Sequence, residues 1–268
     1  MTFLRWAGSK RQLIPILSSF WYAASRRDGG SRYVEGFCGS AALFFSVRPK
    51  QGLLIDCNAA LVECIEQVKM SPRRVSLALS GFAPDEDTYY RVRAFDTDHL
   101  EPALRAARFI YLNRLCFNGL YRTNAAGHFN VPFGGWKSGR LPSVQNLSEA
   151  SLTLRTTTVV CGDFQSAVMK NLRKGDFVYL DPPYAVRNKS LDFQYGPDVF
   201  GSGDIERLAV LASEIDSIGA TFVISYADCP EIAALVNRWG CERVQVRRTV
   251  AATASRRQPA TEVLISNL

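Results

Sequence analysis

Short apolar runs alternate with stretches of helical spacing along most of the chain. The runs predict strands within 33–40 and at 52–56, 158–161, 176–180 and 220–225, with a closing β pair at 243–250 and 262–266. Helical spacing predicts helices that begin near residue 41 and at 59–70, 164–171 and 204–218. Because strands and helices alternate, we expect an α/β fold built on a mainly parallel sheet that helices cover.

The segment 71–147 breaks this alternation. Residues 87–95 and 103–115 have helical spacing, and the stretch FNGLYRTNAAGHFNVPFGGWKSGRLPS then combines glycine, asparagine and proline with aromatic and basic residues. Such a stretch is too polar for a core and too aromatic for a simple linker. We therefore interpret 71–147 as an inserted lobe that reads a substrate, and 1–70 together with 148–268 as the sheet domain.

The composition is typical of a globular protein, since the 268 residues are 47% hydrophobic and 21% charged. No apolar run approaches the ~20 residues of a membrane span, and the first residues, MTFLRWAGSKRQL, lack the apolar region of a secretory signal. The seven cysteines are scattered and form no CxxC pair. We expect reduced thiols in a cytoplasmic protein, and no metal site.

The formal net charge of +7 suits a polyanionic partner such as nucleic acid. A moderately basic soluble protein would have the same charge, so charge alone does not decide between these interpretations. Histidine-based acid–base or metal chemistry is poorly supplied, because the chain contains only His99 and His128.

The strand predicted at 176–180 runs into Asp181, two prolines and Tyr184. Proline has no N–H to donate to a sheet, so the strand must end there. In a doubly wound sheet, ligands bind beyond the carboxyl ends of the strands, where an acid is a candidate for chemistry and a tyrosine ring for stacking. The alternative is a proline-rich loop that carries a solvated aspartate.

Three further stretches are candidates for binding a cofactor. The strand within 33–40 enters a turn with Gly36 and Gly39 but lacks a full GxGxxG, which suggests a nucleoside cofactor without a pyrophosphate. Asp56 ends the second strand, where an acid can accept hydrogen bonds from ribose hydroxyls. The third stretch, Trp6–Lys10, is either a surface turn or a turn that closes over a ligand and pairs its lysine with a carboxylate.

The inserted lobe contains side chains that suit the edges of nucleic-acid bases. Asparagine and arginine bind adenine and guanine edges bidentately in the major groove. The alternative is a solvated loop in which asparagine and glycine form turns. The residues of this kind and their basic and aromatic neighbours are Asn118, Arg122, Asn124, Trp136, Lys137 and Arg140.

Four groups of residues, in one order, carry a resemblance over nearly the whole chain: RWAGSK; VEGFCGSAALFF with LIDCNAAL; YLNRLCFNGLYRTN with GHFNVPFG; and LDPPY. In this arrangement the chain resembles the Dam-type DNA adenine-N6 methyltransferases (D12 class, α-group). The resemblance implies a Rossmann-like S-adenosylmethionine-dependent methyltransferase sheet with an inserted, mainly helical DNA-recognition domain. It also implies methyl transfer from S-adenosylmethionine to a flipped-out adenine in a short site of double-stranded DNA, with GATC as the candidate site.

The resemblance also assigns roles to individual residues. The catalytic motif is Asp181, Pro182, Pro183 and Tyr184. Cofactor binding falls to Trp6, Ala7, Gly8, Lys10, Glu35, Phe37, Gly39, Asp56, Asp163, Phe164 and Asp181. The positions that face DNA are Arg5, Asn118, Arg122, Pro132 and Trp136, and the composition of the insertion adds Asn124 and Lys137. One position departs from the family pattern: Ala41 stands at the second glycine of FxGxG, where its methyl group would affect cofactor affinity.

The chemistry of adenine fits these residues. Its amino group is a weak nucleophile because the lone pair is delocalised into the ring. The Asp181 carboxylate and the Pro182 carbonyl can each accept one of its N–H groups, and the prolines hold both acceptors in place. Two alternatives stay open: transfer to cytosine N4 or an RNA base, and a catalytically inactive protein that binds DNA. A cognate restriction endonuclease is a candidate partner, and we expect a monomer.

Overall fold

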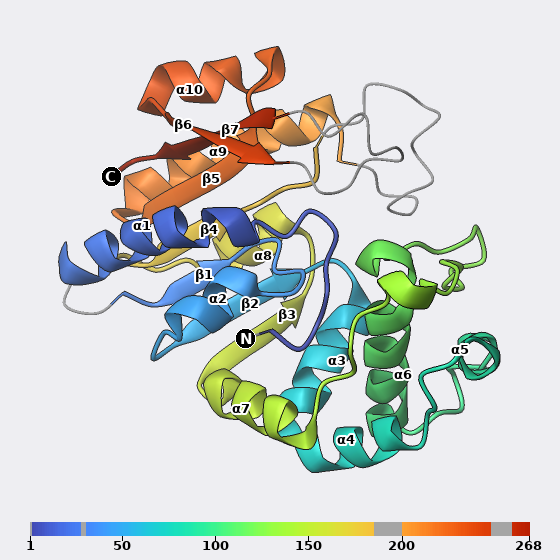
Figure 1. Ribbon diagram of the computed structural model, residues 1–268. Coiled ribbons are helices and arrows are strands. Elements are labelled where there is room, and N and C mark those ends of the chain that lie inside the picture. The colour runs from blue at the N-terminus through green and yellow to red at the C-terminus, as the bar shows by residue number, and fades with distance from the viewer. Residues whose placement is uncertain (1, 28–30, 185–199, 248–258) are drawn as a thin grey trace.

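A seven-stranded sheet lies at the centre of the computed structural model, which describes residues 2–27, 31–184, 200–247 and 259–268 (Figure 1). The strand order is β3-β2-β1-β4-β5-β7-β6. Strands β1 to β5 are mutually parallel, whereas β7 runs antiparallel to both β5 and β6. The predicted α/β fold is thus confirmed, and so is its closing β pair, except for 248–250, which lie outside the described residues. The bounds are β1 Tyr33–Glu35, β2 Gly52–Asp56, β3 Thr157–Cys161, β4 Phe177–Leu180, β5 Thr221–Ala227, β6 Glu242–Arg247 and β7 Pro259–Ser266.

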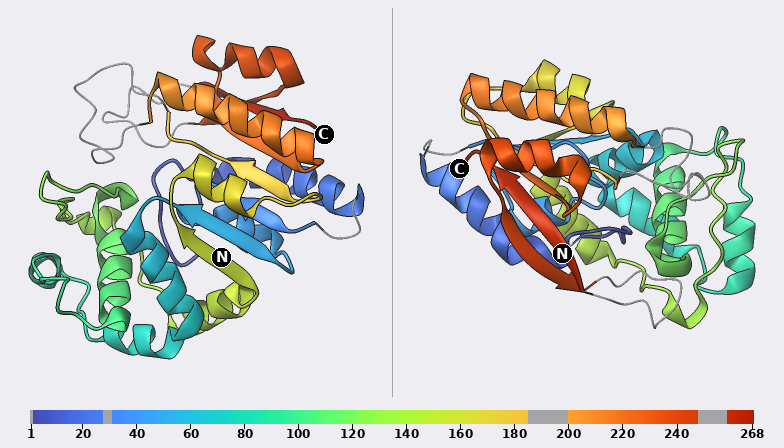
Figure 2. Two further views of the ribbon diagram at one scale, coloured as in Figure 1. Left: turned by 180° about the vertical axis from the view of Figure 1, so that it is seen from behind. Right: turned by 90° about the horizontal axis from the view of Figure 1, so that it is seen from above.

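Helices cover both faces of the sheet (Figure 2). Side chains alternate along a strand, so Tyr33 packs into one core and Val34 into the other. On the first face, the Trp21 ring lies edge-on to Tyr33 and Phe177, with centroid distances of 5.6 and 5.5 Å. Burial on both faces explains why these strands are almost wholly apolar. The first face carries α1 Ile14–Arg27, α2 Ala42–Val47 and α3 Ala59–Met70, and the second carries α8 Phe164–Asn171, α9 Ser202–Ile218 and α10 Ala233–Trp239.

Four further helices gather at the end of the sheet where α3 lies (Figure 1). Their buried side chains belong to the same core as the α1 face, so the insertion and the sheet share one apolar interior. The helices expected at 87–95 and 103–115 are present as α5 and α6, whereas α1, α4, α7 and α10 have no counterpart in the sequence analysis. Among the described helices, none combines the length and the apolar character that crossing a membrane requires. The bounds are α4 Pro72–Ser80, α5 Glu86–Arg93, α6 Pro102–Leu115 and α7 Val144–Leu154.

Residues 116–140 follow α6 and fold back on themselves. We call this segment the 116–140 loop. Isolated β-bridges join Cys116 to Phe133 and Thr123 to Phe129. Two short 3₁₀ turns lie in the arms of the loop, at Phe117–Gly119 and Gly135–Lys137. The polar and aromatic side chains of this segment are therefore carried by a hairpin-like loop rather than by a regular helix.

Asn113 of α6 fastens the N-terminal segment to the insertion. This side chain is 1% exposed. Its Oδ1 accepts the Arg5 N–H at 2.8 Å, and its Nδ2 donates to the Arg5 carbonyl at 2.6 Å. Gly119 (φ +66°) lets the segment lie close, because an added Cβ there would be 2.8 Å from the Arg5 Cβ. One buried amide therefore satisfies both backbone groups of Arg5.

Replacing Asn113 by alanine is expected to destabilise the fold. The change leaves two backbone groups of Arg5 without partners and should lower the free energy of unfolding by roughly 2–4 kcal/mol. Urea unfolding followed by circular dichroism measures the change. The matched control is Asn237→Ala, since Asn237 is exposed on α10 and should shift that free energy by less than about 0.5 kcal/mol. Equal effects of the two substitutions would contradict the anchoring role of Asn113.

Candidate active site

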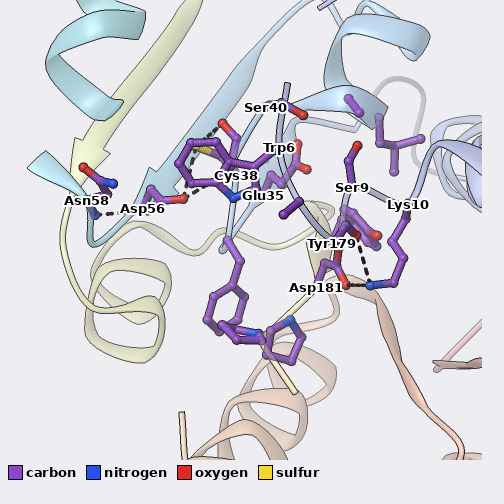
Figure 3. Close-up of a pocket in the computed structure, with 18 of the residues that line it drawn as sticks. Trp6, Ser9, Lys10, Glu35, Cys38, Ser40, Asp56, Asn58, Tyr179 and Asp181 are labelled. Atoms are coloured by element: carbon purple, nitrogen blue, oxygen red, sulfur yellow. Dashed lines mark hydrogen bonds and ion pairs between the residues drawn. The ribbon is translucent and has the colours of Figure 1, made fainter. Parts of the chain in front are cut away.

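A cavity of about 400 Å³ lies at the edge where the parallel strands end (Figure 3). Most of the residues that line it come from four stretches: 6–10, 35–40, 56–58 and 181–184. Every residue of the expected catalytic motif lines this cavity, as does every expected cofactor residue except Asp163 and Phe164. The stretches meet because β1 pairs in parallel with both β2 and β4, so their carboxyl ends lie at one edge.

Asp56 joins the turns that follow β1 and β2. Its Oδ2 accepts the Gly39 N–H at 2.9 Å, and its Oδ1 accepts the Asn58 N–H at 3.0 Å. Gly39 has φ +46°, and an added Cβ would lie 2.8 Å from the Trp6 ring, so this turn requires glycine. Burial raises the pKa of Asp56, although the two backbone N–H groups act in the opposite direction. Each carboxylate oxygen keeps acceptor capacity for a ligand hydroxyl.

Trp6 connects the cavity to the insertion. Its ring is stacked on Tyr121, with a centroid distance of 5.8 Å, and on Phe109 of α6, with a centroid distance of 6.5 Å. Tyr121 also lines the cavity. The 116–140 loop therefore forms part of the cavity wall, beside the strand ends.

Glu35 is a buried acid on the same wall. The Tyr33 hydroxyl donates to Glu35 Oε2 at 3.0 Å. Burial raises the pKa of Glu35 well above its ordinary value. A cationic group bound nearby would favour the charged carboxylate and lower that pKa again. This part of the wall is therefore suited to a ligand with a positive charge.

Asp181 is held through one oxygen, which Lys10 contacts at the wall of the cavity (Figure 3). Its Oδ1 lies 2.8 Å from Lys10 Nζ and accepts the Ser225 hydroxyl at 2.8 Å. Among the described residues, none donates a hydrogen bond to Asp181 Oδ2. Burial lowers the pKa of Lys10, but the negative charges of the Asp181 and Glu262 carboxylates raise it by more, so the ammonium stays protonated.

Two buried hydroxyls stand in line behind Asp181. Ser225 has one hydroxyl hydrogen, which it donates to the carboxylate. The Tyr179 hydroxyl must therefore be the donor in its 3.0 Å contact with Ser225 Oγ. The order Tyr179, Ser225, Asp181 orients the carboxylate from the interior of the sheet. No sequence pattern indicates a role for Tyr179 or Ser225.

Glu262 is a further site residue without a role in the sequence analysis. It lies on β7, where its Oε1 accepts the Tyr184 hydroxyl and its Oε2 is 3.9 Å from Lys10 Nζ. The sign of this residue in the sequence is an acid that stands directly before the apolar run VLI. A carboxylate buried in such a run needs a partner, and pattern alone does not show where that partner is.

Ala41, the departure from FxGxG, is not among the lining residues of the cavity. It is fully buried in the core and precedes α2 with φ 50° and ψ 43°. This left-handed conformation costs a residue other than glycine about 1–2 kcal/mol. The consequence of the alanine that the structure shows is therefore backbone strain at the start of α2.

Asp163 and Phe164 lie behind the cavity wall. Asp163 caps α8 by accepting the Ser166 N–H at 3.1 Å, and it pairs with Arg207 at 2.5 Å. Phe164 stacks on the lining residue Phe37, with a centroid distance of 4.8 Å. Phe37 thus connects these two residues with the cavity.

The residues expected to face DNA gather on and around the 116–140 loop. Arg5 reaches the loop from the N-terminal segment, and its guanidinium donates to the carbonyls of Arg114 and Lys137 at 3.4 and 3.3 Å. Arg122 Nε donates to Asn130 Oδ1 at 2.7 Å, which fixes the side chain across the hairpin. Of the others, Asn118 has φ 56°, Asn124, Pro132 and Lys137 are exposed, and Trp136 lies in the second 3₁₀ turn.

The class of the protein follows from the sheet, the cavity at its edge and the aspartate that two prolines follow. Together they define a Rossmann-like methyltransferase. The sequence matches the family described as D12 class N6 adenine-specific DNA methyltransferase over residues 6–250, and the chain belongs to this family. The reaction of the family is methylation of adenine N6 in DNA, which implies a DNA substrate and a methyl donor.

Named relatives extend over almost the whole chain. The Type II methyltransferase M1.LlaDCHI of Lactococcus lactis subsp. cremoris is 31% identical, over 99% of this chain and 94% of its own length. The Type II methyltransferase M.MjaIII of Methanocaldococcus jannaschii is 30% identical, over 99% and 98%. A DNA adenine methylase of Serratia marcescens is 31% identical, over 98% and 96%.

The direction of the hydroxyl chain predicts unequal effects of two substitutions. Ser225→Ala leaves the buried Tyr179 donor without an acceptor and should lower the free energy of unfolding by about 1–3 kcal/mol. Tyr179→Phe removes the first donor of the hydroxyl chain and leaves no other group without a partner, so a loss of about 0.5–1.5 kcal/mol is expected. Urea unfolding of both variants tests this order. A larger loss of unfolding free energy for Tyr179→Phe than for Ser225→Ala would mean that the hydrogen bonds of the hydroxyl chain point in the opposite direction.

Proposed function

We propose that the protein is a site-specific DNA adenine-N6 methyltransferase that uses S-adenosylmethionine and acts on an adenine flipped out of a short duplex site. GATC is the candidate site. The observation that carries the proposal is Asp181, which has one oxygen held by Lys10 and Ser225 and no donor to the other among the described residues. We further propose 71–147 as the target-recognition domain, a monomer as the working state, and a cognate restriction endonuclease as a candidate partner.

The cavity suits S-adenosylmethionine in size and charge. Its volume of about 400 Å³ lies within the roughly 300–1,000 Å³ typical of small-molecule sites. The acids Glu35, Asp56 and Asp181 line it, which suits a ligand that carries sulfonium and ammonium charges. Asp56 is available to accept the ribose hydroxyls, as an acid at the end of a second strand does in related nucleotide sites. When bound, the cofactor supplies the methyl group.

Asp181 and Pro182 are the proposed acceptors for the target amino group. When the two N–H groups of adenine N6 donate to them, the nitrogen lone pair leaves conjugation with the ring and becomes nucleophilic. The prolines restrict the backbone of the turn, and Lys10 and Ser225 hold the carboxylate. Acceptors fixed in advance need little reorganisation during the reaction, which is the main source of their effect on rate.

The target adenine must leave the duplex to reach these acceptors. A base inside a duplex is stacked and paired, so extrusion costs a few kcal/mol. The Tyr184 ring lines the cavity beside Asp181 and offers a flat face for the extruded base. Stacking on such a ring recovers about 1–3 kcal/mol per base.

An assay with labelled S-adenosylmethionine and duplex DNA tests the proposed function. After digestion, the label should be in N6-methyladenine, and sequencing of the methylated DNA should show whether the site is GATC. Label in N4-methylcytosine, or label found only on RNA, would overturn the proposal. Tight DNA binding without any label would instead support the catalytically inactive alternative.

Asp181→Ala is expected to abolish methyl transfer while DNA binding survives. The substitution removes one of the two acceptors for the target amino group and leaves the 116–140 loop unchanged. Transfer is measured by the label assay, and DNA binding by fluorescence anisotropy. Asp87→Ala serves as the control, since Asp87 is exposed on α5, and it should leave both readings at wild-type values. Persistent transfer in the Asp181 variant would show that its assigned role is wrong.

Arg122→Ala is expected to weaken or relax site recognition. Loss of a bidentate base contact should cost about 1–3 kcal/mol for the preferred site and less for other sequences. Competition binding with DNA duplexes that differ at one base pair measures the difference. Arg73→Ala on α4 removes an equal charge at the end of the inserted helices far from the 116–140 loop (Figure 1). If both variants keep the wild-type preference, the recognition residues lie elsewhere.

A further inference from the structure

Glu262 reaches the site because β7 is antiparallel. Strands β1, β2 and β4 bring their carboxyl ends to the cavity, whereas β7 brings its amino-terminal end to the same edge of the sheet, with Glu262 opposite Ala227 of β5. Glu262 shares a face of the sheet with Leu264, which packs into the α1 core. The last strand of the chain therefore delivers an acid to the same edge and the same face as Asp181.

The two oxygens of Glu262 have different surroundings. Oε1 accepts the Tyr184 hydroxyl. Oε2 is buried, has no hydrogen-bond partner among the described residues, and lies 3.9 Å from Lys10 Nζ. The residue is only 3% exposed. A carboxylate buried in this way is costly unless its charge is paired, so its presence at this position calls for a reason other than packing.

Lys10 is the centre of this group. Its ammonium lies 2.8 Å from Asp181 Oδ1 and 5.0 Å from the centroid of the Tyr184 ring, on the side where Glu262 provides a second negative charge. The Tyr184 ring is also packed edge-on against Tyr226 of β5 at 5.4 Å. The acid and the ring of the Asp181–Tyr184 turn are thus both held by contacts that converge on Lys10 and Glu262.

We propose that Glu262 is a positioning residue for methyl transfer, which fixes the Tyr184 ring through one oxygen and shares the Lys10 ammonium with Asp181 through the other. The inference rests on the proposed function and assigns it a residue outside the Asp181–Tyr184 turn. Glutamine is not equivalent, because the Tyr184 hydroxyl and the Lys10 ammonium are both donors and an amide presents only one acceptor. A carboxylate presents an acceptor to each.

A double-mutant cycle tests this proposal. Glu262→Gln should lower kcat by about tenfold or more, because small misplacements in an active site have effects of that size or larger. Tyr184→Phe should lower kcat through loss of the same contact, and the double variant should lose less than the product of the two single losses. The dissociation constants for S-adenosylmethionine and DNA should stay within about twofold. Glu242→Gln on β6 is the control, since Glu242 is exposed, and it should keep wild-type kcat.

Several outcomes would overturn the proposal. They are a wild-type kcat for Glu262→Gln, multiplicative losses in the double variant, or a loss confined to the binding constants. Thermal unfolding is measured for every variant. Should Glu262→Gln not fold, Tyr184→Phe decides, since it leaves β7 intact: a lowered kcat supports the proposal and an unchanged kcat refutes it. Failure of the proposed function is distinct, because the wild-type protein would then produce no N6-methyladenine.

Discussion

The contact between Lys10 and Asp181 is the interaction on which the arrangement of the site depends. It joins the N-terminal segment to the turn after β4, across the cavity. The same segment is fastened to α6 by Asn113 and stacks Trp6 on Tyr121. One short stretch of chain therefore fixes the position of the sheet edge relative to the inserted helices. A displacement at either end of this stretch would shift Asp181.

Local patterns predict the parts of the structure that depend on local physics. Apolar runs with turn residues give β1 to β5, and helical spacing gives α3, α5, α6, α8 and α9 close to their observed bounds. Since parallel strands share a carboxyl edge, the residues that end them were also expected to meet there. The helices α4 and α7 were not predicted, although Pro72 begins one and a Ser143–Asn146 capping box begins the other. Few of their residues are buried, namely Val75 and Leu79 in α4 and Leu147, Ala150 and Leu154 in α7, so each has a short apolar pattern.

The rest of the site depends on tertiary contacts that no local pattern contains. Ser225 donates to Asp181 from 44 positions away, and Tyr184 donates to Glu262 from 78 positions away. The second contact requires the register that sets Glu262 opposite Ala227, and a slip of one residue would turn the acid to the other face. The strain at Ala41 is likewise invisible in sequence, where only a missing glycine is seen.

A catalytic acceptor has to be held without losing its capacity to accept. Lys10 and Ser225 both contact Asp181 Oδ1, so in the proposed reaction holding and accepting would fall to different oxygens of one carboxylate. An ammonium paired with Asp181 alone would draw its negative charge toward Oδ1 and weaken Oδ2 as an acceptor. In the role proposed for Glu262, its carboxylate offsets this effect, because it supplies a second negative charge to the same ammonium. The chemistry expected of four consecutive residues is therefore a property of three strands, β4, β5 and β7, and of the segment that carries Lys10.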